Sequence, residues 1–224
     1  TTDATGIAAL TGWTLGNSTG PNTLNATAGT LAGSPLTFTA TGTAAGASSI
    51  AINAGDGQTT TVGTAVASPP AVMVRDQFNN PVAGVTVTFA VTSGGGSVTG
   101  ATKITNAAGI AAVGTWTLGT TAGANTLTAT AGTLAGSPLS FTATGTAGSA
   151  SSIAINAGDG QTATVGLAVA APPAVIVRDQ FNNPVAGVAV TFAIASGGGS
   201  ISGATQTTNA AGIAAVGTWT LGTT

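Results

Sequence analysis

A ten-residue segment, RDQFNNPVAG, occurs twice without change, at residues 75–84 and at residues 178–187. The chain has eight charged residues, and four of them form an Arg-Asp pair in each copy of this segment. Oxygen atoms of carboxylates and amides are the ligands that Ca²⁺ prefers in proteins. Asp76 with Asn79 or Asn80 is therefore one candidate Ca²⁺ site, although Ca²⁺ takes roughly six to eight oxygens and few are available here.

The same residues are also typical of a structural loop, and this is the interpretation that we favour. Asp and Asn side chains accept backbone N–H bonds in turns, and the ring of Pro81 fixes its φ angle. We expect Asp76 to close the loop, with Arg75 covering it or pairing with a neighbour. Asp179 and Pro184 have the equivalent structural roles in the second copy.

The remaining composition excludes most enzyme chemistry. The chain has no His, Cys, Tyr or Glu, so it lacks the residues for a common zinc site, a Cys nucleophile or a Ser-His pair. Five scattered Asp residues offer little for catalysis by paired carboxylates. We predict no enzymatic activity, no catalytic residue and no cofactor.

Partners are constrained in the same way. A net charge of −2 provides no basic surface for nucleic acid. No apolar run reaches the length of a membrane-spanning helix, because Thr and Gly interrupt every one, so we predict no membrane span in this segment. Thr and Ser are abundant, so O-linked glycans on these residues are one alternative that the sequence leaves undecided. The first residues, TTDATGIAAL, do not resemble a signal peptide, so any export signal is expected outside this segment.

An internal repeat of 103 residues is the main feature of the chain. Residues 48–121 align with 151–224 without a gap and differ at eleven positions, and residues 1–47 align with 104–150. A unit of this length has the size of a domain rather than of a solenoid repeat. We predict three parts: 1–47 is the C-terminal part of one unit, 48–150 is a complete unit, and 151–224 is the N-terminal part of another.

Each unit is predicted to be all-β. Apolar and polar residues alternate in short segments separated by turn signals, and Thr, Val and Gly are poor helix formers. We expect about eight strands, at 49–53, 59–63, 71–76, 85–91, 102–105, 109–119, 125–132 and 137–145, with SGGGS at 93–97 as a turn. Two packed antiparallel sheets follow, and we predict tandem immunoglobulin-like (Ig-like) β-sandwiches. Trp116 and Trp219 are expected to be core residues.

Two motifs extend this prediction. The pattern D-x-x-x-N-P-V-x-G-V-x-V-x-F at 76–89 and the segment TNAAGIA at 105–111, with the Thr-rich closing strands, resemble the bacterial Ig-like domain of group 1. Tandem domains of this group occur in adhesins of the invasin and intimin type. The resemblance implies an extracellular or cell-surface array, with no catalytic residue.

Three functions are consistent with these observations. The first is an extracellular structural protein of a bacterium that builds a filament, sheath or surface layer. The second is the passive stalk of a cell-surface adhesin, and the third is a carbohydrate- or receptor-binding module. We also expect self-association among neighbouring repeats or subunits. Both incomplete units are expected to be completed by other polypeptide, either the continuing chain or a neighbouring subunit through strand complementation.

Overall fold

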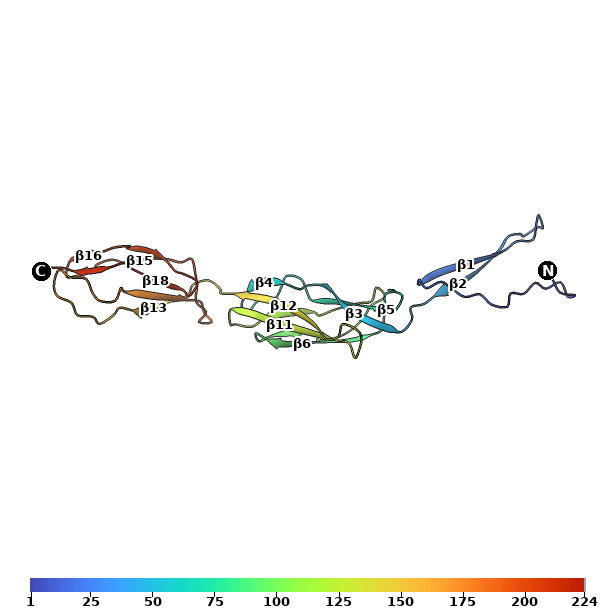
Figure 1. Cartoon of the computed structure of the whole chain (residues 1–224), viewed down its shortest axis with the longest axis horizontal. Helices are drawn as coiled ribbons and strands as arrows, with labels where there is room; N and C mark the ends of the chain where they lie inside the picture. The colour runs from blue at the N-terminus through green and yellow to red at the C-terminus, as the bar shows by residue number, and fades with distance from the viewer. Residues whose placement is uncertain (224) are drawn as a thin grey trace.

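The computed structural model describes residues 1–223, and all of its regular structure is β (Figure 1). An N-terminal hairpin, a middle unit and a C-terminal unit follow one another in an extended row, with the two chain ends at opposite ends of the molecule (Figure 1). Among these residues there is no helix that could cross a membrane. The prediction of an all-β fold is confirmed.

Ten strands make up the middle unit. They are β3 (Ala47–Ala54), β4 (Gln58–Thr61), β5 (Ala71–Asp76), β6 (Thr86–Ser93), β7 (Gly96–Thr99), β8 (Thr102–Ile104), β9 (Ile110–Ala112), β10 (Thr115–Leu118), β11 (Gly123–Thr130) and β12 (Leu139–Thr146). One sheet has the order β4-β12-β11-β6-β8, a second has the order β3-β5-β9, and β10 pairs with β7. The pairs are antiparallel except β4 with β12, which are parallel.

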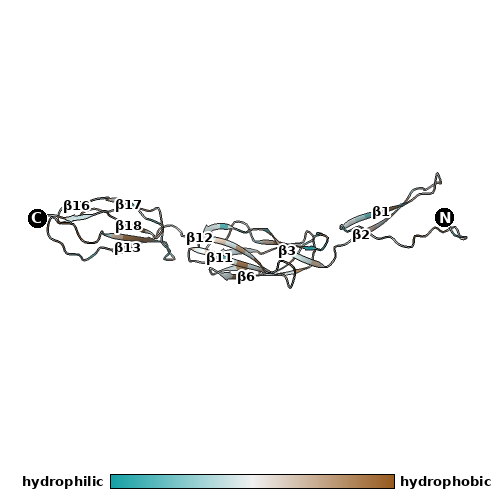
Figure 2. Ribbon diagram, in the orientation of Figure 1, coloured by the Kyte–Doolittle hydropathy of each residue, from teal (hydrophilic) through white to brown (hydrophobic). Residues whose placement is uncertain are grey.

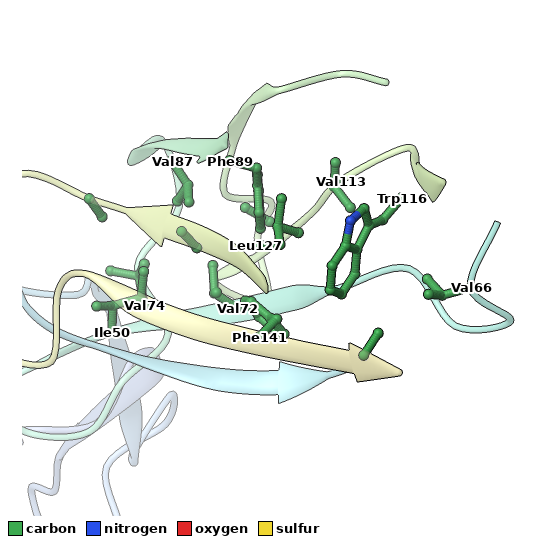
Figure 3. Packing of buried hydrophobic residues seen from close by; sticks show 14 of the residues in the cluster. Ile50, Val66, Val72, Val74, Val87, Phe89, Val113, Trp116, Leu127 and Phe141 are labelled. Carbon is green, nitrogen blue, oxygen red and sulfur yellow. The ribbon is translucent and has the colours of Figure 1, made fainter. Parts of the chain in front are cut away.

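The core lies between these sheets because apolar side chains occupy alternate positions along their strands. In β12, Phe141 and Ala143 are buried whereas Thr142 and Thr144 are exposed. Side chains from both sheets meet around Trp116, which is fully buried (Figure 3). The other largest side chains of this cluster, also fully buried, are Phe89, Leu118, Leu127 and Phe141. In Figure 2 the strongest hydrophobic colour lies on strands, for example β6.

The middle unit has ten strands, whereas about eight were predicted. The predicted strand at 109–119 is interrupted at Val113 and Gly114, where β9 leaves its pairing with β5 and β10 begins to pair with β7. A Cβ at position 114 would lie 2.5 Å from the Thr99 side-chain oxygen, so glycine permits this close crossing. The segment predicted as a turn at 93–97 contains the start of β7. A one-dimensional pattern cannot detect this change of sheet.

The C-terminal unit repeats part of this arrangement. Its strands are β13 (Ser152–Ala157), β14 (Ala174–Arg178), β15 (Ala189–Thr191), β16 (Gly199–Ile201), β17 (Thr205–Thr207), β18 (Ile213–Ala215) and β19 (Trp219–Leu221). They pair as β13-β14-β18, β15-β17 and β16-β19. At the other end of the chain, β1 (Gly20–Ala26) and β2 (Leu36–Gly42) form a hairpin. The domain boundaries at 47/48 and 150/151 stay predictions.

Candidate functional site: a repeated joint between units

The RDQFNNPVAG segments form a tight loop that follows β5 in the middle unit and β14 in the C-terminal unit. One carboxylate oxygen of Asp76, Oδ1, accepts hydrogen bonds from the backbone N–H groups of Phe78 (2.9 Å) and Asn80 (2.8 Å). Asn79 has a φ of 70°, in the left-handed region that Asn tolerates better than most residues. Arg75 donates from Nη1 to the Asn79 carbonyl at 2.7 Å. The Arg-Asp pair thus closes the loop from both sides.

The second loop also binds the middle unit that precedes it in the chain. The Asn183 side chain donates to the carbonyl of Thr120 at 2.8 Å and accepts from the N–H of Ala122 at 2.8 Å. The Asp179 carboxylate accepts from the N–H of Gly148, in the connection between the two units, at 2.9 Å. The loop therefore contacts both the body of the preceding unit and the connecting segment.

The first loop makes the same contacts with the N-terminal segment. Asn80 donates to the Asn17 carbonyl at 2.7 Å and accepts from the Thr19 N–H at 3.1 Å. Asp76 accepts from the Ala45 N–H at 2.9 Å. We call this set of contacts the joint. Its partners on the preceding side are backbone atoms, so the joint forms although Asn17 and Thr19 replace Thr120 and Ala122.

An aromatic contact accompanies the second joint. A Cβ at Gly63 would lie 3.3 Å from the Phe181 ring, so the ring of one unit rests against the backbone of the other. Gly63 has a φ of +71°, which most other residues adopt only with strain. Phe181 and Phe78 are exposed large hydrophobic residues, and they lie in the two joint loops rather than in a sandwich core.

The electrostatics of the joint favour the ionised carboxylate. Burial of Asp76 raises its pKa, but the Asn80 side chain and the backbone N–H groups of Ala45, Asn80 and Phe78 stabilise the charge and together lower the pKa to about 2. Asp179 has the equivalent partners, and its pKa is also lowered against the opposing effect of burial. The joint thus depends on a charge that persists at neutral pH.

The other predicted structural residues support the loop or the core. Pro81 forms an isolated antiparallel β-bridge with Arg75, and Pro184 forms one with Arg178. Each loop therefore turns back alongside the end of the strand before it. Trp116 is fully buried, and Trp219, its equivalent in the C-terminal unit, is half-buried.

In the structure, the carboxylate of the candidate calcium site, that of Asp76, accepts hydrogen bonds from protein N–H groups. Oδ1 of Asp76 accepts two backbone N–H bonds, and Oδ2 accepts from Ala45 and from the Asn80 side-chain amide at 2.9 Å. N–H donors therefore surround both oxygens of the carboxylate. No group of three or more His, Cys, Asp or Glu residues that could hold a metal ion occurs within residues 1–223. The calcium alternative stays a prediction.

Reasoning from the sequence did not find Asn80 and Asn183 as contacts between units. The available signal was the NNP that both copies of the segment contain, combined with the small-residue connections at 42–49 and 145–152. An Asn in a turn is explained well enough by its own loop. Only the folded chain places this side chain against a backbone segment more than sixty residues earlier.

Comparison with known proteins supports the fold. No protein-family model and no curated protein sequence matches the chain. Among solved structures, the chain is similar to FdeC, an Escherichia coli adhesin, with a TM-score of 0.51 and 20% identity. This match covers 86% of the chain and 63% of the FdeC chain, so the chain spans less than two thirds of that relative's length.

Two further solved structures are similar at lower TM-scores. The D0-D1 domain of intimin gives a TM-score of 0.36 at 24% identity, over 80% of the chain and 86% of the intimin chain. Invasin, a bacterial integrin-binding protein, gives 0.36 at 23% identity, over 79% of the chain and 34% of the invasin chain. The described residues form an all-β array of Ig-like β-sandwich units, and their structural neighbours include the adhesin FdeC.

Proposed function

We propose that this chain is a non-enzymatic part of an extracellular array that projects or links other structures at a bacterial cell surface, as the stalk of an adhesin does. The observation that carries the proposal is the joint, which occurs at both junctions with the same hydrogen bonds. A joint that fixes two successive units in the same way yields a regular, extended row, which suits a spacer.

We assign the units to the bacterial Ig-like group 1 as part of this proposal. The motifs at 76–89 and 105–111 support the assignment, because they contain the joint loop and the turn that packs against it. Gly109, in the second motif, donates the N–H of a turn to Asn106, and its carbonyl accepts from Val74 at 2.8 Å. The likeness to the fold of FdeC, an adhesin, supports a location at the cell surface.

A filament, sheath or surface layer is the second candidate, and the composition of the outer faces favours it. Only 4% of the residues are charged, and the outward positions of β11 and β12 are mostly Thr and Ser. Surfaces of this kind, with a net charge near zero, tend to associate. In a filament, sheath or surface layer, such uncharged faces of neighbouring arrays would pack against one another.

Immunoelectron microscopy of cells that make the protein tests both candidates. An antibody against residues 48–150 is expected to label threads that extend outward from isolated points on the cell surface. Label on a continuous lattice or along ordered bundles would favour the filament, sheath or surface layer. Label confined to the cell interior would overturn the proposed function.

A further inference from the structure

The middle unit has one parallel pair of strands, β4 with β12. β12 is the last strand of the unit, and β4 follows the first strand, β3, after a short turn. Gln58 pairs with Ala143 at one end of the parallel ladder. Thr61 pairs with Thr146 at the other end. The N-terminal and C-terminal parts of the unit are therefore bonded directly to each other.

Further hydrogen bonds extend this pair beyond its ladder. Before β4, the N–H of Gly57 donates to the carbonyl of Thr142 at 3.0 Å. After β4, the N–H of Val62 donates to the carbonyl of Thr146 at 2.9 Å. The Thr146 hydroxyl also donates to the Thr60 carbonyl at 3.3 Å. The contact between the two strands is thus longer than the strands themselves.

The carboxylate of Asp56 adds a charged contact at the start of the pair. Its Oδ1 accepts from the N–H of Thr142 at 2.7 Å and from the Thr142 hydroxyl at 3.0 Å. The bond from the Thr142 N–H is the main reason that the pKa of Asp56 lies below its ordinary value. Hydrogen bonds to an ionised group are about twice as strong as those between neutral groups. We call the β4–β12 pair and these Asp56 bonds the clamp.

The turn that holds Asp56 is itself fixed to the unit. Gly55 has a φ of +85°, and a Cβ there would lie 2.7 Å from the backbone of Pro70, so glycine permits this close packing. The Gln58 side chain donates to the carbonyls of Gly55 at 2.8 Å and Ser68 at 2.7 Å. It also accepts from the Ser68 N–H at 2.8 Å. Asp56 is therefore held in place against β12.

The first strand is bonded to the same part of the unit. Ser49 of β3 forms a parallel bridge with Ala135, in the segment that leads into β12. The N–H of Ile50 donates to the Ala135 carbonyl at 3.0 Å, and the N–H of Ala135 donates to the Ser48 carbonyl at 3.0 Å. β3 and β4 thus both run parallel to the C-terminal end of the unit.

The position of the clamp matters when the row of units is stretched. Figure 1 shows the strands of the middle unit lying along the row. The joints hold the connections on either side, through Ala45 at Asp76 and Gly148 at Asp179. Tension along the row therefore enters the unit before β3 and leaves it after β12.

Such tension draws β4 towards the N-terminal end of the row and β12 towards the C-terminal end. The two parallel strands must then slide along each other, so their hydrogen bonds bear the force together. A hairpin that is pulled apart at its open end yields one bond at a time. Release of β3 alone frees only the chain before Gly57, so the unit does not unravel from its N-terminal end until the clamp breaks.

We propose that each unit carries tension along the array, and that the β4–β12 pair with Asp56 is the element that resists it. The proposal goes beyond the proposed function, which concerns the placement of other structures and not the force on them. Resistance to force depends on the rate of unfolding and not on the equilibrium free energy of unfolding, so the two can be separated by experiment.

Single-molecule force spectroscopy on the 224-residue chain is the test. The chain has no Cys, so Thr43→Cys and Ser149→Cys give two unique and exposed attachment points on either side of the middle unit. Pulling between them loads the clamp along its strands. We expect one high-force event that releases the chain between Gln58 and Thr146, about 30 nm at roughly 3.4 Å per residue.

A second pulling direction is the matched control. Ala124→Cys and Thr144→Cys replace exposed cross-strand partners at the open end of the β11–β12 hairpin. Pulling between them separates the strands bond by bond, so the unit should yield at a lower force. An equal force in both directions would overturn the proposal. This comparison needs no change at Asp56, so it decides the matter even if variants of that residue do not fold.

Variants separate the clamp from general stability. Asp56→Ala should lower the force along the row, and Asp56→Asn, which keeps an oxygen acceptor, should lower it less. Thr105→Ala is the control, because this buried hydroxyl bonds Val85 and Val82 and lies outside the clamp. It should lower the urea midpoint and leave the force along the row unchanged. Undiminished force in Asp56→Ala would contradict the role of the carboxylate and overturn the proposal as stated.

Discussion

The side-chain amide of Asn183 donates a hydrogen bond to the backbone carbonyl of Thr120, which lies 63 positions earlier and in the preceding unit. The same side chain also donates to the Asp179 carboxylate, at 2.9 Å to Oδ2. Asn183 therefore joins the closure of its own loop to the placement of the neighbouring unit. A change at Asn183 is therefore expected to affect both the conformation of its loop and the position of the preceding unit.

Asn183→Ala is expected to loosen the second joint while leaving both units folded. The change removes the bonds to Thr120 and Ala122 and, within the loop, the bond to Asp179. A typical hydrogen bond contributes about 0.5–1.5 kcal/mol, so the loss of the two bonds between the units should be about 1–3 kcal/mol. Small-angle scattering should report a more variable distance between the units, and protease should cleave the connection at 147–150 faster. Gln180→Ala in the same loop is exposed and should change neither result.

Acid should weaken the joints. A carboxyl group in an unfolded chain has a pKa of about 3.9, and the folded pKa of Asp76 is about 2. A lowered folded pKa gives stabilisation that is fully present above about pH 4 and is lost as pH falls towards 2. The urea midpoint of the whole chain should follow this course. The double variant Asp76→Asn, Asp179→Asn should have a lower midpoint at pH 7 and a flatter pH profile, and an unchanged profile would contradict the assignment.

Calcium should have no effect on stability. Protein N–H groups occupy both oxygens of Asp76, which leaves no free carboxylate in the loop. A ligand at 100 times its dissociation constant adds about 2.7 kcal/mol, which a melting experiment detects easily. Melting curves in millimolar Ca²⁺ and in chelator should coincide. A rise with Ca²⁺ that the chelator reverses would restore the metal-site hypothesis for Asp76, Asn79 and Asn80.

Trp116 should be the most sensitive single position in the middle unit. It is fully buried among large apolar side chains, and Trp-to-Ala changes in cores cost about 3–5 kcal/mol. Its indole nitrogen is buried without a hydrogen-bond partner in the structure, so Trp116→Phe loses volume but no hydrogen bond and should cost less. Urea unfolding of the two variants gives the comparison. Thr88→Ala, on the outward face of β6, should stay within about 0.5 kcal/mol.

The repeat and the all-β fold could be predicted because both depend on the order of residues along the chain. A spacing of 103 residues needs no structure to be seen, and the alternation of Phe141 and Ala143 with Thr142 and Thr144 specifies which face of β12 is buried. Cross-strand order was harder to predict. The break between β9 and β10 depends on which strand each one meets, and that is a property of the packed sandwich.

The Arg-Asp loop also has one property that the sequence predicts and one that only the tertiary structure determines. The residue types Asp76, Asn79 and Pro81 already determine a tight turn, because each satisfies or restricts backbone groups within a few positions. That Asn80 and Asn183 hold the preceding unit was decided only by the tertiary structure, because it brings the loop against a backbone segment far away in the chain. Backbone atoms carry no residue-specific signal, so the identity of the partner could not be read from the sequence.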